Sequence, residues 1–143
     1  MNWKSEAIDR LNRYPIMVQA MENIPKELDR LERSIQELRG CDPTKNFSAK
    51  NPGPMDDILI GNIIKRQELF GCYENARIWV DTTKSALSAL DDEERTVLTK
   101  MYVNPEKGVV NQLCMALGVE QSSIYRKRDQ ALLRFTIALY GTA

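Results

Sequence analysis

The sequence predicts an all-α protein. We expect an N-terminal helical hairpin, antiparallel and coiled-coil-like, over residues 1–90, and a C-terminal helix-turn-helix domain over residues 91–143. Three observations support this prediction. Residues 17–38 have an apolar heptad seam, residues 55–90 have a second apolar stripe, and residues 113–135 contain two short apolar patterns separated by Gly118. Apolar residues that recur every three or four positions are typical of amphipathic helices.

Residues 2–13 have the pattern of a short amphipathic helix. Asn2 is placed as its N-cap. The apolar positions that follow are Trp3, Ala7, Ile8 and Leu11. Tyr14 and Pro15 come next, and a residue that precedes proline is biased away from the helical region. We therefore expect the chain to bend or restart at this dipeptide.

A heptad seam dominates the next stretch. Its apolar positions are separated alternately by four and three residues, and they are Met17, Met21, Ile24, Leu28, Leu31, Ile35 and Leu38. A seam of this spacing packs against another helix. Pro25 interrupts it and leaves two arrangements open, a kink in one long helix or the start of a second helix capped by Asn23. The mixed charges between the seam positions predict a solvated face.

Residues 40–54 separate the seam from the next helical stretch. Gly40 ends the first helix, and the three prolines and two asparagines that follow predict an irregular loop. A second long helix is expected over residues 55–90, with Asp56 and Asp57 in its first turn. Gly61 and Gly71 weaken this helix, and a break near Gly71 is one outcome. Because a long amphipathic helix needs a partner for its stripe, we expect residues 55–90 to fold back on residues 17–38.

The C-terminal third begins with a helix-capping pattern. Asp91 and Glu94 have the spacing of a capping box, with an aspartate as the cap. The helix is expected to extend to about Tyr102, and the polar residues from Asn104 to Gly108 predict a turn.

The pattern around Gly118 is that of a helix-turn-helix motif. Leu113, Ala116 and Leu117 share one face of a short first helix, and Gly118 is suited to ending it because glycine enters the left-handed region without strain. Val119 is placed to fill the angle between the two helices. The buried stripe of the second helix consists of Ile124, Ala131, Leu132 and Phe135. Two short helices joined by a glycine-containing turn can place the second helix in a DNA major groove.

The exposed face of that second helix is the candidate site. Ser122, Tyr125 and Arg126 are separated by three and four residues and project together, near the N-terminal end where base-contacting residues lie. Over residues 119–134, four basic residues face two acidic ones, a local excess of +2. This pattern favours binding of double-stranded DNA. The alternative is an ordinary corner between two helices in a helical protein.

Composition limits the other functions. The 143 residues contain 20 Lys and Arg against 20 Asp and Glu, so the net charge is zero and any phosphate binding must come from a local patch. No histidine is present, which excludes chemistry based on that residue. Three widely spaced cysteines indicate reduced thiols in a cytosol. No apolar run has the length of a membrane span, so we expect none. We also expect no metal or cofactor. Helix capping explains the carboxylate pairs Asp56-Asp57 and Asp91-Asp92, so we expect no enzymatic activity.

The C-terminal third also resembles a known family. LDDEERTVLTKMYV, a turn, and QLCMALGVEQSSIYRKRDQALLRF are similar to the fourth conserved region of sigma-70-type factors. With a helical N-terminal half and a Pro/Gly loop, the whole chain resembles the ArpU/RinA-type regulators of phage late genes. The resemblance implies a DNA-binding transcription regulator encoded by a phage or prophage, located in the cytoplasm of a bacterial host cell. The implied partners are double-stranded DNA, RNA polymerase and a second copy of the chain.

The resemblance also implies roles for individual residues of the helix around residues 121–135. In its register Gln121, Ser122, Tyr125 and Arg126 face bases. Ser123 and Arg128 lie nearer the phosphates. The chain departs from the family pattern in the first helix, which starts with Val109-Val110-Asn111-Gln112 and has no Ser or Thr cap, and at two positions of the second helix. Glu120 stands where Ser or Thr usually caps the second helix. Lys127 occupies a position that is usually apolar, so its stem is expected to lie along the core edge with the ammonium in solvent.

Two other functions fit the same elements. Small-terminase proteins of phage DNA packaging also combine a helix-turn-helix with helical oligomerisation segments, but they form rings. A helical adaptor without DNA binding is the other alternative, and the zero net charge is consistent with it.

Overall fold

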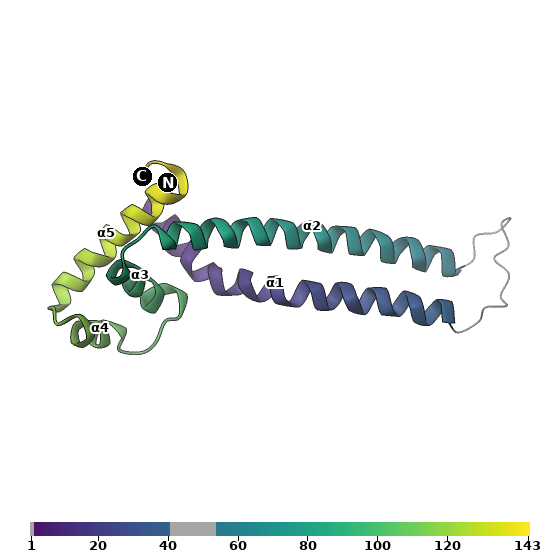
Figure 1. The fold of residues 1–143 in the computed structure, drawn as a ribbon, viewed down its shortest axis with the longest axis horizontal. Helices are drawn as coiled ribbons and strands as arrows, with labels where there is room; N and C mark the ends of the chain where they lie inside the picture. Colours follow the sequence, from purple (N-terminus) through teal and green to yellow (C-terminus); the bar gives the residue numbers. More distant parts are fainter. Residues whose placement is uncertain (1, 41–53) are drawn as a thin grey trace. The chain divides into compact units, whose positions relative to one another are not determined.

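The computed structural model describes residues 2–40 and 54–143, and all regular structure within them is helical (Figure 1). The α-helices are α1 (Trp3–Gly40), α2 (Pro54–Ser88), α3 (Asp92–Leu98), α4 (Val109–Leu117) and α5 (Gln121–Tyr140), and a π-helical turn, η1 (Thr99–Val103), continues α3. The expectation of an all-α protein is confirmed for these residues. The loop expected at residues 40–54 falls almost entirely on 41–53, which lie outside the described part. None of the helices in that part has the length and apolar character of a membrane span.

The chain forms two compact units. Of the described residues, the first unit combines 2–18 with 78–143, and the second contains 19–40 and 54–77. The first unit therefore brings the beginning of α1 and the end of α2 together with α3, α4 and α5.

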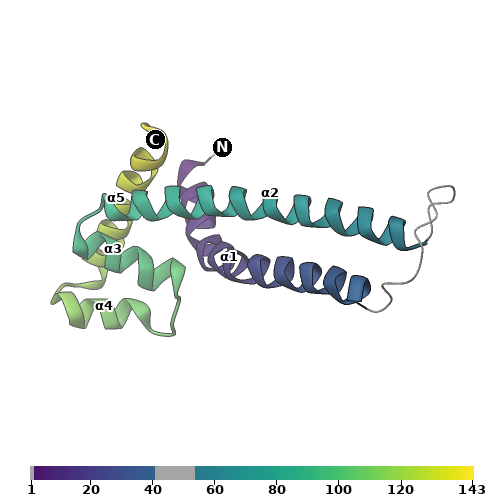
Figure 2. The same cartoon turned by 45° about the vertical axis from the view of Figure 1, so that its right-hand side comes forward.

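The second unit consists of one segment of α1 and one of α2, which run side by side in opposite directions (Figures 1 and 2). Leu31 and Ile35 of the heptad seam are buried here, and Ala76 of α2 is buried as well. The other seam residues of α1 in this unit are half-buried: Met21, Ile24, Leu28 and Leu38. The apolar stripe thus lies between the two helices, because that arrangement removes it from water.

Asn62 of α2 is a polar residue that lies between the two helices of this unit. The side-chain Nδ2 of Asn62 donates a hydrogen bond to the carbonyl oxygen of Leu31, at 3.0 Å. Its Oδ1 is shielded from solvent and has no hydrogen-bond partner within residues 2–40 and 54–143. A polar residue at a seam position selects one register at a cost in stability.

We predict that Asn62→Leu will raise the melting temperature of the chain. Leucine removes an unsatisfied buried oxygen and adds apolar contact, and we expect a gain of about 1 kcal/mol. Circular dichroism during heating measures the effect. Asn12→Leu is the control, because Asn12 is exposed on α1 and reports only the difference in helix propensity. A gain no larger than that of Asn12→Leu would contradict the assignment of Asn62 to the seam.

Both long helices continue through residues that were expected to interrupt them. The restart expected as one outcome at Tyr14 and Pro15 is wrong, since α1 includes both residues. Neither Pro25 nor Gly71 begins a new helix. A proline inside a helix removes one backbone hydrogen bond and costs about 3 kcal/mol. Helix α1 tolerates Pro15 because the turns around it are held by packing, with Leu11 fully buried.

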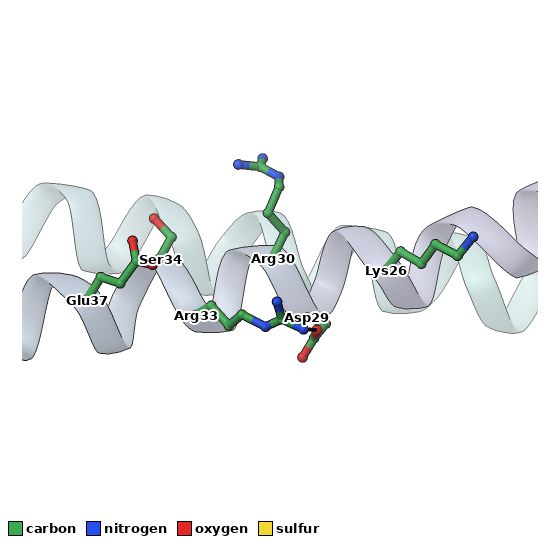
Figure 3. A pocket seen from close by; sticks show the side chains of 6 residues that line it. All are labelled: Lys26, Asp29, Arg30, Arg33, Ser34 and Glu37. Carbon is green, nitrogen blue, oxygen red and sulfur yellow. Dashed lines mark hydrogen bonds and ion pairs between the residues drawn. The ribbon is translucent and has the colours of Figure 1, made fainter.

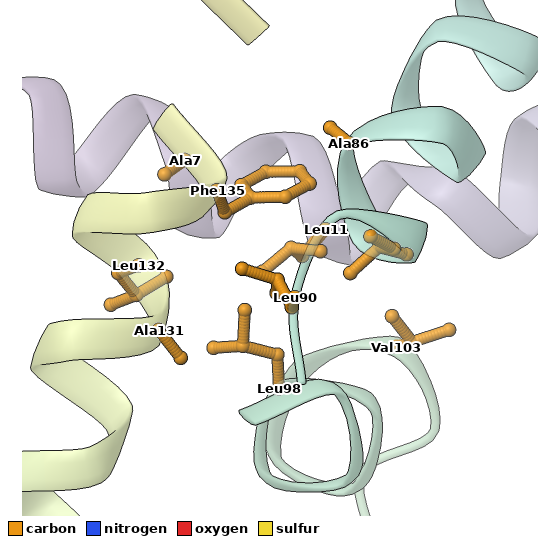
Figure 4. Packing of buried hydrophobic residues seen from close by; sticks show 10 residues of the cluster. Ala7, Leu11, Ala86, Leu90, Leu98, Val103, Ala131, Leu132 and Phe135 are labelled. Carbon is orange, nitrogen blue, oxygen red and sulfur yellow. The ribbon is translucent and has the colours of Figure 1, made fainter. Parts of the chain in front are cut away.

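The core of the first unit lies where four helices meet (Figure 4). Ala7 and Leu11 come from α1, Ala86 and Leu87 from α2, Leu98 from α3, and Ala131, Leu132 and Phe135 from α5, with Leu90 and Val103 beside them. The start of α1 is capped as expected, since Oδ1 of Asn2 accepts a hydrogen bond from the Lys4 N–H at 3.1 Å.

Helix α3 begins at the predicted cap. Oδ1 of Asp91 accepts a hydrogen bond from the backbone N–H of Glu94 at 2.8 Å, and this N–H is the main reason why the pKa of Asp91 is lowered. The helix continues as η1 rather than as a regular α-helix up to Tyr102. The N–H of Asn104 bonds to the carbonyl of Thr99 at 2.9 Å, five residues earlier. Such turns insert one extra residue and re-aim the side chains that follow.

Candidate nucleic-acid interface

Helices α4 and α5 are joined by a tight turn of three residues. Gly118 ends α4 with a φ of 66°, the left-handed conformation that glycine adopts without strain. The N–H of Val119 bonds back to the carbonyl of Cys114 at 3.2 Å. Glu120 is extended, and α5 starts at Gln121. The expected end of the first helix at Gly118 is therefore observed.

A second apolar cluster fixes this pair of helices. Val97 of α3, Val109 and Leu113 of α4, and Ile124 of α5 are buried together. Five partly buried residues pack around them, namely Met101, Val110, Cys114, Leu117 and Val119. Because Ile124 is 0% exposed, the residues on the opposite side of the first two turns of α5 must face outward.

The predicted site residues divide into two groups. Gln121, Ser122, Tyr125 and Arg126 are exposed on the first two turns of α5. These are the residues that were expected to face bases. Ser123 and Arg128, which were expected near phosphates, are half-buried. The four exposed residues form one continuous surface on a helix whose other side is held in the core. We call this surface the α5 face.

Most basic side chains of α5 are paired with acids. The Lys127 ammonium bonds to the Glu93 carboxylate of α3, Arg134 bonds to Glu94 of α3 at 2.8 Å, and Arg128 bonds to Asp129 at 3.0 Å. Arg126 differs from them. Within the described ranges, 2–40 and 54–143, no acidic side chain lies against its guanidinium. The local positive charge of the α5 face is thus concentrated on Arg126.

The position of Lys127 departs in part from expectation. Its side chain is only partly exposed, as expected, but the ammonium does not extend freely into solvent. The hydrogen bond that it donates to Glu93 raises the pKa of Lys127. Lys127 therefore links α5 to α3. Glu120 forms no side-chain hydrogen bond to the start of α5, which is consistent with the absence of a Ser or Thr cap.

The guanidinium of Arg128 packs against the ring of Tyr125. Its guanidinium carbon lies 5.0 Å from the centre of the Tyr125 ring, which is cation–π geometry. Asp129 accepts hydrogen bonds from Nε and an Nη atom of Arg128 at 3.1 and 3.0 Å. Asp129 is bound in turn by Lys4 of α1 at 2.7 Å. The hydrogen bond from Lys4 is the main cause that lowers the pKa of Asp129, and Arg128 lowers it further. Burial raises the pKa of Tyr102.

Glu94 ties α3 to the middle of α5. Its side chain is 7% exposed and accepts a hydrogen bond from Arg134, whose own side chain is mostly exposed. Burial is the main cause that raises the pKa of Glu94, and the nearby Asp91 carboxyl adds to it, while Arg134 opposes both. The second carboxylate oxygen, Oε2, is buried and has no hydrogen-bond partner in the described part of the chain.

A polar depression elsewhere is a weaker candidate. It lies on α1 and is lined by Lys26, Asp29, Arg30, Arg33, Ser34 and Glu37 (Figure 3). Arg30 is paired with Glu27, and Arg33 with Asp29. All the lining residues come from one helix, so the depression is a charged helix surface rather than a binding site. Within residues 2–40 and 54–143, no group of three potential metal-binding side chains is close enough to hold an ion.

Comparisons with protein-family models, with curated proteins and with solved structures found no match. The interpretation of the α5 face therefore depends on its geometry. No pattern in the sequence indicates that Lys4, Asp129 and Glu94 belong to this region. Asp129 could have been noticed as an acid beside Arg128, but Lys4 lies at the other end of the chain and leaves no local signal.

Proposed function

We infer that the chain binds double-stranded DNA by inserting the first two turns of α5 into the major groove. The observation that supports this most is the α5 face itself. Gln121, Ser122, Tyr125 and Arg126 are exposed together, whereas Ile124 on the same turns is fully buried. A helix so anchored can present its N-terminal residues to base edges, as second helices of helix-turn-helix motifs do.

The charge distribution favours base contacts over general coating of the DNA backbone. Lys127, Arg128 and Arg134 are already bound to acids, so they are less available to phosphates. Arg126 has a rigid fork of donors that can bond O6 and N7 of a guanine together. Gln121 and Ser122 offer further hydrogen bonds to bases. We propose that Arg126 supplies the main sequence preference.

The wider role that we propose is transcription regulation. It depends on the resemblance of the C-terminal third to the fourth region of sigma factors, and RNA polymerase would then be a second partner. The zero net charge is compatible with this role, because a sequence-specific site needs a local rather than a global positive charge.

We predict that Arg126→Ala will weaken binding to the preferred duplex by about 1–3 kcal/mol and relax the preference at one base pair. The preferred duplex is first obtained by selecting bound fragments from random double-stranded DNA. Titrations against this duplex and a random duplex at two salt concentrations then measure the effect. If Arg126→Ala binds the selected duplex as tightly as the unmodified chain, the α5 face does not contact bases through Arg126.

Arg126→Lys is the matched control, since it keeps the charge but loses the two-donor fork. We expect it to bind the random duplex as the unmodified chain does, with the same salt dependence, and to lose the base preference. Arg128→Ala provides a second comparison. If Arg128 leaves Asp129 to contact a phosphate, its removal weakens all sequences alike and lowers the salt slope by about one. Failure of the unmodified chain to select any sequence would reject the proposed function.

A further inference from the structure

Helix α2 has a second apolar stripe that faces away from α1. Ile60, Ile63, Ile64 and Phe70 are 56%, 46%, 50% and 57% exposed, while Leu59, Leu69 and Tyr73 on the other side are only partly exposed and Ala76 is buried. With Gln67 and Gly71, the exposed residues recur at heptad spacing. We call residues 60, 63, 64, 67, 70 and 71 the outer stripe. Apolar residues at this spacing are typical of a surface that packs against a helix.

The two helices of the second unit differ in their outward surfaces. The outward surface of α1 is charged (Figure 3). Its basic residues Arg30 and Arg33 are paired with Glu27 and Asp29 of the same helix. Only α2 exposes large apolar side chains in this unit, within the residues that the structure describes. Scattered exposed leucines or isoleucines are ordinary, but a contiguous apolar stripe indicates an interaction surface.

Gly71 adds a second observation. It lies in the outer stripe, in the interior of α2, where glycine is less favourable than alanine. A Cβ atom added to Gly71 would meet nothing within 4 Å. No packing contact within the described residues therefore requires a glycine here. A close approach of another helix would make use of the missing side chain.

One heptad position of α2 is self-complementary. Asp56, Ile63, Phe70 and Arg77 follow one another at intervals of seven residues and so share one side of the helix. Their order along α2 is acidic, apolar, apolar and basic. In an antiparallel pair of such helices, each acid meets a base and each apolar residue meets an apolar residue. In a parallel pair, acid would meet acid and base would meet base.

We propose that two copies of the chain pair through the outer stripe, with α2 antiparallel to α2 of the second copy. The two-fold axis passes at the level between Arg66 and Gln67. Ile63 then lies opposite Phe70 of the second copy, and Asp56 lies opposite Arg77. This is an isologous contact, in which the same surface is used twice. The proposal does not depend on DNA binding.

The size of the stripe is consistent with a dimer. Four large side chains that are half exposed, with the atoms between them, present roughly 400–500 Å² of apolar surface. A stable interface buries about 800 Å² on each partner, with an apolar centre and a polar rim. The outer stripe would form the centre. Asp56 and Arg77, which is also bonded to Glu74 of its own helix at 2.8 Å, would lie at the rim. A partner of a different kind would have no reason to match the acidic and basic ends symmetrically.

Sedimentation equilibrium of the full chain over a range of concentrations tests the proposal. We expect a dimer, and Ile64→Glu should raise the dissociation constant by about 100-fold or more while leaving the helical circular dichroism signal unchanged. Ile58→Glu is the matched control. Ile58 is 51% exposed on the same helix but lies outside the outer stripe, so its substitution should leave the dimer intact. A monomeric wild-type chain, or a dimer that survives Ile64→Glu, would overturn the proposal.

Oxidative cross-linking tests the antiparallel register, in a chain whose own cysteines are replaced by alanine. Gln67→Cys places the two introduced thiols next to the axis, and we expect a disulfide-linked dimer. Asn75→Cys places them roughly 25 Å apart along the helices, which is too far for a disulfide. We expect no cross-link at that position. If the Asn75→Cys variant cross-links as readily as the Gln67→Cys variant, the helices are not antiparallel and the proposal is wrong.

Discussion

Phe135→Ala is expected to lower the free energy of unfolding of the first unit by about 3–5 kcal/mol. Phe135 is fully buried and belongs to the cluster in which Ala7, Ala86 and Leu98 from three other helices meet α5 (Figure 4). Removing its ring leaves a cavity, and the four helices around it cannot all move inward to fill that space. Because the stability of a small unit is itself only about 5–15 kcal/mol, the variant should be mostly unfolded under mild denaturant.

Urea titration followed by tryptophan fluorescence measures this effect, since Trp3 packs against the same cluster. Leu133→Ala is the control on the same helix. Leu133 is 39% exposed, and its truncation should cost less than about 1 kcal/mol. If both variants unfold at the same urea concentration, the cluster around Phe135 does not stabilise the first unit as the structure indicates.

Arg134→Leu is expected to cost about 1–3 kcal/mol at pH 7. The substitution leaves the buried carboxylate of Glu94 without its counter-charge. Arg134 itself is largely exposed, so little packing is lost, and the cost comes from the stranded charge. The variant should therefore be far less stable than Arg13→Leu. Arg13 pairs with Asp9 at 3.7 Å with both side chains exposed, and such a pair contributes little.

The pH dependence of this loss of stability tests whether the buried carboxylate of Glu94 causes it. In the folded chain the pKa of Glu94 is above its ordinary value of 4.5, and loss of Arg134 will raise it further. Below pH 4.5 the carboxyl is protonated in both the folded and unfolded states, so the deficit of the variant disappears. Above the folded-state pKa of Glu94 in the unmodified chain the deficit grows, and it levels off once the pH passes the higher folded-state pKa of the variant. Adding Glu94→Gln to Arg134→Leu should abolish this slope. A deficit that is the same at pH 4 and pH 7 would exclude the explanation.

The features that could be predicted from the sequence are those that depend on residues close together along the chain. The seam of α1, the cap at Asp91, the end of α4 at Gly118 and the exposure of Tyr125 and Arg126 all follow from spacing along one helix. Side-chain periodicity alone decides which of these residues turn inward. For the same reason, Ile124 was expected and found in the core.

Features that depend on distant partners were not predictable in this way. Local preference suggested that the chain would bend or restart at Tyr14 and Pro15, but packing of residues on both sides keeps α1 helical through them. The partners of α5 lie far away along the chain, with Glu93 34 residues from Lys127 and Glu94 40 residues from Arg134. No spacing rule connects such pairs. The π-helical turn at Thr99–Val103 also has no sequence signal that we recognise.

The first unit contains segments from both ends of the chain, and this sets the order in which its parts can fold during synthesis. Residues 19–77 can associate once α2 has left the ribosome, because both helices of that unit are then present. Ala7 and Leu11 must wait for Leu132 and Phe135, which are made more than one hundred residues later. Until then the start of α1 exposes its apolar side to water. Pairs so distant in sequence close slowly, so the packing of the start of α1 against α5 would be the last step in the folding of the first unit.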